Sequence, residues 1–88
     1  MTRDEIVQKL TKELEEELEG ILEYNELYNS LVALGCKDEA DRIERIASEE
    51  YYHAKILQDI LWMMNVDVSH HIIINNHWQK VKKIFAIE

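Results

Sequence analysis

The absence of proline is the feature that most constrains the fold of this chain. Its 88 residues include no proline and only two glycines. Sheet sandwiches and barrels reverse the chain often, and their turns depend on these two residue types. Long helices, in contrast, exclude proline from their interior and tolerate little glycine. We therefore expect an all-α protein, organised as a single domain over residues 1–88.

Apolar residues recur at helical spacing from the start of the chain. We predict a first helix over residues 2–34, because steps of three and four residues separate most of these side chains. Thr2 and Glu5 resemble a capping box at its start, and Gly35 follows its end, where glycine often terminates a helix. Gly20 is either tolerated within the helix or marks the close approach of another helix. The predicted apolar stripe comprises Ile6, Leu10, Leu14, Ile21, Tyr24, Tyr28 and Leu31.

A second helix is predicted over residues 38–64, with Asp38 as its N-cap and Asn65 as its left-handed stop. The short connection around Gly35 makes the first two helices an antiparallel hairpin. The second apolar stripe comprises Ile43, Ile46, Ala47, Ala54, Leu57, Leu61 and Met64.

A third, shorter helix is predicted over about residues 68–86. Asp67 and Ser69 are the two candidate residues for its start. Three successive β-branched residues, 72–74, leave a short strand as the minor alternative. The lysines near the end of this segment suit the negative end of a helix dipole. The predicted core face comprises Ile74, Trp78, Val81 and Phe85.

The charge of the chain narrows the classes of partner. A formal net charge of −8 argues against nucleic acids and anionic membranes. No apolar run approaches the roughly 20 residues that span a bilayer, and the first residues do not resemble a signal peptide. A single thiol, Cys36, fits a reducing compartment, so we expect a cytoplasmic protein. Because so short a chain buries little surface and has no disulfide, self-association or a bound metal is expected to stabilise it.

Two glutamates interrupt the predicted apolar stripes. A rotation of about 100° per residue places Glu17 in the middle of the first stripe and Glu50 in the middle of the second. His53 lies one turn after Glu50, at the edge of the same stripe. A carboxylate that faces a core is costly, because burial penalises its charged form. The antiparallel hairpin brings these residues to similar heights, where one bound cation compensates both carboxylates.

The number of ligands points to a dimer. Dinuclear iron and manganese carboxylate bundles use two single glutamates and two Glu-x-x-His motifs from four helices. This chain has one of each, and its predicted third helix contains no internal acidic residue. We therefore predict a homodimer in which each chain contributes Glu17, Glu50 and His53 to metals near the two-fold axis. In the alternative interpretation, Glu17 reaches solvent at the edge of an oligomer interface and Glu50 pairs with a basic residue across it.

Six residues of the predicted hairpin share a characteristic spacing: Glu17, Tyr24, Gly35, Glu50, His53 and Ala54. This set resembles the first helical hairpin of the ferritin-like superfamily, as in bacterioferritins and rubrerythrins. The runs 16–19 and 49–54 also resemble encapsulated ferritins, which are half-ferritins with two long helices and a short third helix. The resemblance covers residues 13–64. It implies that two chains dimerise into a ferritin-like four-helix bundle.

The same resemblance implies an activity, namely ferroxidase-type oxidation of Fe(II) by oxygen or peroxide. Glu17, Glu50 and His53 would be the iron ligands, with about two irons per dimer. Tyr24 would join the catalytic site by hydrogen-bonding a ligand. The same donors also suit manganese.

Some positions depart from the family pattern. Glu23 stands where encapsulated ferritins have an aromatic residue, and the hairpin spacing fits bacterioferritin better. Glu16 and Glu19 match acidic residues that line the route of the metal in encapsulated ferritins, or else belong to a solvated helix face. We expect no shell-targeting tail after Ile87-Glu88. A homo-oligomer, at least a dimer, is therefore the expected assembly, and a shell protein (encapsulin) is a partner by resemblance alone.

Other interpretations of the chain remain open. It could be a non-catalytic helical dimer that serves as an adaptor, or a manganese- or iron-binding protein without redox activity. Asp67, His70, His71 and His77 form a weaker candidate metal set, since Asp67 and His71 are four residues apart. Such histidines are more often ordinary polar positions on a helix. Cys36 has no evident activating partner and is interpreted as incidental.

Overall fold

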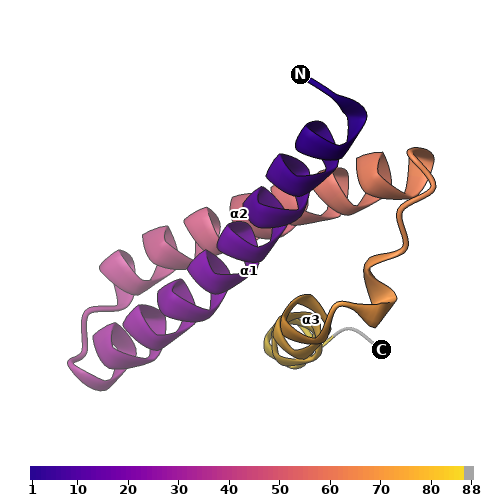
Figure 1. Cartoon of the computed structure of the whole chain (residues 1–88). Helices are drawn as coiled ribbons and strands as arrows, with labels where there is room; N and C mark the ends of the chain where they lie inside the picture. Colours follow the sequence, from indigo (N-terminus) through magenta and orange to yellow (C-terminus); the bar gives the residue numbers. More distant parts are fainter. Residues whose placement is uncertain (87–88) are drawn as a thin grey trace.

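Three α-helices and one short 3₁₀ turn make up the regular structure (Figure 1). The computed structural model describes residues 1–86, and within that range there is no strand, so the all-α prediction is confirmed. No helix in the described range is long and apolar enough to cross a membrane. The expected absence of a targeting tail after 87–88 lies outside the described residues. The elements are α1 (Arg3–Ala33), α2 (Lys37–Met63), η1 (Val68–His70) and α3 (Ile72–Ile84).

Helices α1 and α2 form the predicted antiparallel hairpin (Figure 1). The Thr2 hydroxyl accepts a hydrogen bond from the Glu5 backbone N–H at 3.2 Å, so the predicted cap of α1 is present. Gly35 adopts a left-handed φ of 78°, as its place after α1 requires. Asn65 ends α2 in the same way, with a φ of 63°. Both predicted helix stops are therefore confirmed.

The start of α2 differs from the prediction. The helix begins at Lys37, and Cys36 occupies the cap position without a side-chain capping hydrogen bond. The Cys36 backbone N–H donates to the carbonyl of Leu31 at 2.9 Å, which closes the end of α1. One residue thus ends the first helix and begins the second, so Asp38 lies inside the first turn. The negative charge of Asp38 there interacts favourably with the positive end of the helix dipole.

The third predicted helix is interrupted. The chain first forms η1, where the Asp67 carboxylate accepts a hydrogen bond from the Ser69 N–H at 2.8 Å. It then extends at His71, whose Nδ1 accepts a hydrogen bond from the Ile74 N–H at 3.2 Å and caps α3. Helix α3 therefore begins at Ile72 and ends at Ile84, which is shorter than the predicted range. The β-branched residues 72–74 form its first turn, so the strand alternative is wrong.

Helix α3 runs across the hairpin and closes the core against it (Figure 1). The Tyr51 ring of α2 lies edge-on to Trp78, with centroids 5.9 Å apart, and 4.8 Å from Phe85. Leu18 is fully buried although it lies outside the predicted stripe. Helix α1 contacts both α2 and α3, so a wider face of α1 is covered than one stripe. The buried core cluster comprises Leu14, Leu18, Ile21, Ala54, Leu61, Ile74, Trp78 and Val81.

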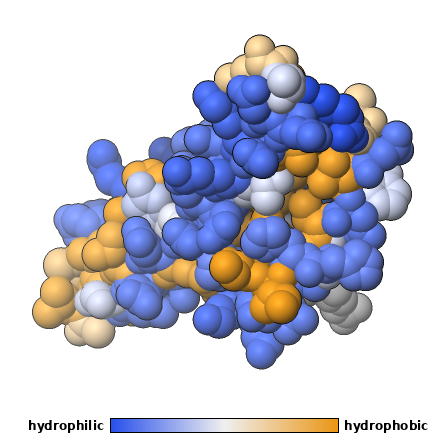
Figure 2. All heavy atoms as spheres, viewed as in Figure 1, coloured by the Kyte–Doolittle hydropathy of each residue, from blue (hydrophilic) through white to orange (hydrophobic). Residues whose placement is uncertain are grey.

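One face of the hairpin retains exposed apolar side chains. Ile46 is 38% and Ile60 37% exposed on α2. His53 lies midway between Ile46 and Ile60 at seven-residue spacing, which places the three on one face of α2. Apolar atoms are also visible over the loop end of the hairpin in Figure 2. We refer to Ile46, His53 and Ile60 as the open face.

Candidate metal site

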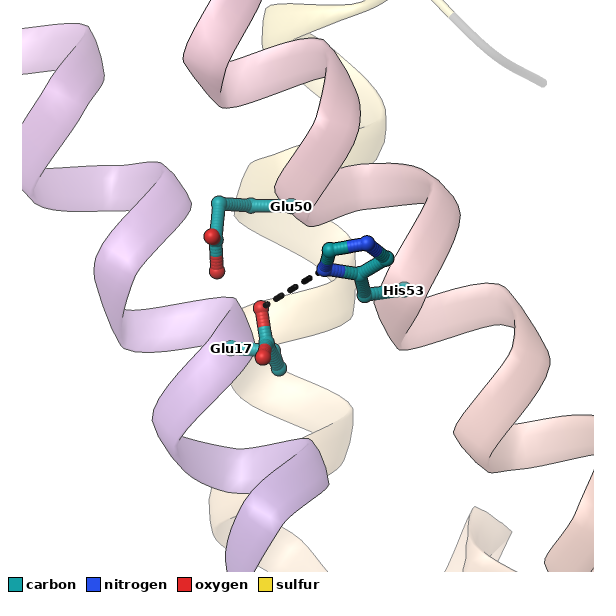
Figure 3. A group of neighbouring side chains, drawn as sticks. All are labelled: Glu17, Glu50 and His53. Carbon is teal, nitrogen blue, oxygen red and sulfur yellow. Dashed lines mark ion pairs between the residues drawn. The ribbon is translucent and has the colours of Figure 1, made fainter.

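Glu17, Glu50 and His53 converge between the middle of α1 and the middle of α2 (Figure 3). Each side chain offers one ligand atom, and these atoms all lie within 4.8 Å of one another. No other group of three such residues meets this description within residues 1–86. We call these residues the Glu/His cluster. The hairpin thus brings together the three residues that the sequence predicted as ligands.

Gly20 provides space beside this cluster. A Cβ atom added to Gly20 would lie 3.8 Å from Oε2 of Glu50, which is ordinary van der Waals contact. The glycine therefore marks the approach of a side chain from α2. An alanine would fit at this position, whereas a longer side chain would compete with the Glu50 carboxylate for space.

Glu17 carries the unusual electrostatics of the cluster. Its Oε2 atom is buried, has no hydrogen-bond partner in the described chain, and lies 4.0 Å from Nδ1 of His53. Burial first, then the neighbouring Glu50 carboxyl, and last the charges of Glu13 and Glu16 together raise the pKa of Glu17 to about 7. The site therefore accepts positive charge readily, either as a proton or as a cation.

The cluster opens towards the outside of the hairpin. The His53 side chain is 55% exposed and the Glu17 side chain 21% exposed. Both Ile46 and Ile60 flank His53 on the same face of α2. One chain therefore presents two carboxylates and one imidazole at an apolar surface, and any further ligand must come from outside this group.

The Tyr24 side chain is not part of the Glu/His cluster. It forms no hydrogen bond with any member of the Glu/His cluster among residues 1–86. Together with Tyr28 it lines a cavity of about 230 Å³ that extends to Ile84 and Phe85 at the end of α3. Its predicted hydrogen bond to a metal ligand stays a prediction.

The two other acidic candidates on α1 have partners outside the cluster. Glu16 lies 4.0 Å from the Lys12 ammonium, one turn earlier on the helix. Glu19 lies 3.4 Å from Nε2 of His77, so it joins α1 to α3. Sequence reasoning missed this contact, because the helical period does not reveal where α3 docks. A role for Glu16 and Glu19 in metal delivery stays a prediction.

The weaker metal set does not assemble as a group of ligands within the described range. Asp67 caps η1 and His71 caps α3, so hydrogen bonds to the backbone account for both. His77 faces Glu19 instead. Cys36 is a free, half-buried thiol between α1 and α2.

Comparisons of the chain with family models, with curated proteins and with solved structures each found no significant match.

Proposed function

We propose that this chain is a ferritin-like half-bundle that dimerises around a dinuclear iron site and oxidises Fe(II). The observation that carries the proposal is the Glu/His cluster. Two carboxylates and an imidazole within 4.8 Å of one another form a donor set that suits iron and manganese. The resemblance of the hairpin to ferritin-like proteins supports the same activity.

The charge balance of the cluster fits a cation. Glu17 has a buried carboxylate oxygen without a hydrogen-bond partner in the described part of the chain. Glu50 approaches it from α2 and adds a second negative charge when both are ionised. His53 offers a nitrogen but not a fixed positive charge. A divalent ion relieves the repulsion between the carboxylates and gives the unpartnered oxygen a ligand bond.

The open face supports a second copy of the chain as the partner. Two symmetry-related clusters would supply the two single glutamates and two Glu-x-x-His motifs that a dinuclear bundle uses. Burial of the exposed parts of Ile46 and Ile60 would stabilise the dimer, by less than the about 1.5–3 kcal/mol that complete burial of such a side chain contributes, because each is already more than half buried. Dimerisation would also remove His53 from solvent and dry the site.

The reaction requires two Fe(II) ions as substrate. Each ion gives one electron, so one molecule of oxygen takes two electrons and two protons and leaves as hydrogen peroxide. With peroxide as the oxidant, the same two electrons and two protons yield two waters. The carboxylates of Glu17 and Glu50 would offset the positive charge of the ions. His53 would supply a nitrogen ligand one turn after Glu50 on α2. Mineral storage would need a larger enclosure than a dimer.

Oxygen uptake on addition of Fe(II) tests the activity. We expect rapid uptake by the unaltered chain and a rate near that of free Fe(II) in Glu50→Gln. Glu49→Gln is the matched control, because it removes the adjacent carboxylate, which lies about 100° around α2 from Glu50. An unchanged rate in Glu50→Gln contradicts a catalytic cluster. Metal binding without uptake favours the second candidate, a non-redox manganese or iron protein, which the same donor set supports.

A further inference from the structure

A second recess lies on the opposite side of α2 from the open face. It is a cleft of about 560 Å³ between the second half of α2, the segment that follows it, and α3. Sites for small organic ligands commonly have volumes of about 300–1,000 Å³. Its lining includes Tyr51 and Gln58 of α2 and Trp78 of α3, and no member of the Glu/His cluster. The cleft is therefore separate from the candidate metal site.

Aromatic rings form much of its wall. Both tryptophans of the chain, Trp62 and Trp78, line the cleft together with Tyr51. Trp62 is 68% exposed although it is large and apolar. Trp78 and Tyr51 are held edge to face within the core, so that wall is rigid. Such a wall favours a flat apolar group.

Two lysines give the cleft a feature that is unusual in so acidic a chain. Lys55 on α2 and Lys82 on α3 both line it, and neither has an ion-pair partner among residues 1–86. Of the two acidic residues in the lining, Asp67 is engaged by the Ser69 N–H. This hydrogen bond lowers the pKa of Asp67, so Asp67 stays negatively charged and, together with Asp59, balances the two lysines in formal charge. Because neither lysine is held in an ion pair in the described part of the chain, the cleft still offers cationic groups to an anion from two different helices.

Two buried polar atoms in the lining residues lack partners. The Trp78 indole N–H has no acceptor and the Gln58 Oε1 has no donor in the described chain. Buried groups of this kind are normally hydrogen-bonded. A ligand carboxylate can accept a hydrogen bond from the Trp78 N–H, whereas it has no proton to donate to Gln58 Oε1. An acceptor for the Trp78 N–H is therefore required in addition to the flat shape and the negative charge.

We propose that this cleft binds a small aromatic carboxylate. Its ring packs between the aromatic side chains, and its carboxylate lies between Lys55 and Lys82. The selectivity comes from the pair of charge-assisted contacts, which a neutral ligand of the same shape cannot make. The proposal is independent of metal binding, because the Glu/His cluster is not part of the cleft.

The two indole N–H signals in a proton–nitrogen NMR spectrum test the proposal directly, since both tryptophans line the cleft. Naphthalene-2-carboxylate is the probe, and naphthalene-2-carboxamide is its neutral match. We expect saturable shifts of both signals, with the carboxylate binding about fivefold or more tightly than the amide. Lys82→Gln should weaken carboxylate binding by about fivefold or more. Lys83→Gln, an equal charge change outside the cleft lining, should leave it unchanged.

Three results would overturn the proposal. The first is the absence of saturable shifts in either indole signal. The second is equal affinity for the carboxylate and the amide, which would mean that the lysines do not hold an anion. The third is an equal loss of affinity for the carboxylate in Lys82→Gln and Lys83→Gln, which would mean that only the net charge of the chain affects binding. Retained dispersion of the two indole signals verifies that each variant is folded.

Discussion

Glu17 shows how one residue can determine the character of a helical surface. Its position in an apolar stripe is evident from the sequence, because the helical period alone identifies it. The raised pKa of Glu17 could not be predicted so directly. The pKa depends on burial by α2 and on the approach of Glu50, and both depend on the register of the hairpin. Tyr24 and Glu19 illustrate the same limit, because their neighbours lie on α3.

Removal of metal should make stability depend on pH through Glu17. Its pKa is about 7 in the folded chain and 4.5 ordinarily, so the folded state binds the proton more tightly. The stabilisation from the proton is complete below about pH 4.5 and is lost as the pH rises through 7. Urea unfolding of the metal-free protein should therefore show lower stability at pH 8 than at pH 5. Glu17→Gln should show a smaller fall, and parallel pH profiles for the two proteins would refute this account.

Gly20→Ala should stabilise the chain by up to about 1 kcal/mol, because alanine is the better helix former and the added methyl group fits. The Cβ would meet Oε2 of Glu50 at 3.8 Å, without overlap. Chemical denaturation measures the change. A loss of stability would mean that the space beside Glu50 is needed even in the absence of metal.

At the scale of the elements, the sequence predicts α1 and α2 closely because each has one continuous period and a left-handed stop, Gly35 or Asn65. The segment after Asn65 is harder to predict. Two successive caps, at Asp67 and His71, divide what the pattern presents as a single helix. Side-chain capping is a local competition that the apolar period does not record. Leu18 was missed because one helix packs against two neighbours.

Leu18→Ala should lower the free energy of unfolding by about 2–5 kcal/mol, because it leaves a cavity where α1 meets the core. Leu18 is fully buried. Leu27→Ala provides the control, since that side chain is half exposed on the same helix and should matter much less in the monomer. Urea midpoints of the two variants give the comparison. Equal losses would show that Leu18 is not buried in solution.

At the scale of the whole molecule, the proposed dimer gives the open face and the Glu/His cluster the same explanation. A hairpin of this size covered by α3 on one side leaves its other side without a partner. That side contains exposed isoleucines and an incomplete set of ligands. A second copy of the chain would cover the former and complete the latter. The sequence predicts this pairing from the ligand count, because one chain supplies half of the set that a dinuclear bundle uses.

Ile60→Lys should separate the proposed dimer, because it places a charge where two apolar faces would meet. We expect a folded monomer by analytical ultracentrifugation and circular dichroism, with a loss of iron binding by about tenfold or more. Tyr52→Lys is the control, since Tyr52 is 66% exposed and lies about 100° around α2 from His53. A dimer that persists in Ile60→Lys would place the interface elsewhere.

The most direct test of the central claim is native mass spectrometry after loading with Fe(II) in the absence of oxygen. The account predicts a dimer that carries about two irons, and an iron-free dimer in Glu17→Ala. Glu16→Ala, the adjacent carboxylate that lies near Lys12, should keep its iron. If the unaltered chain takes up no iron, as a dimer or as a monomer, the account is contradicted. Equal iron content in the unaltered chain and the two variants would contradict it as well.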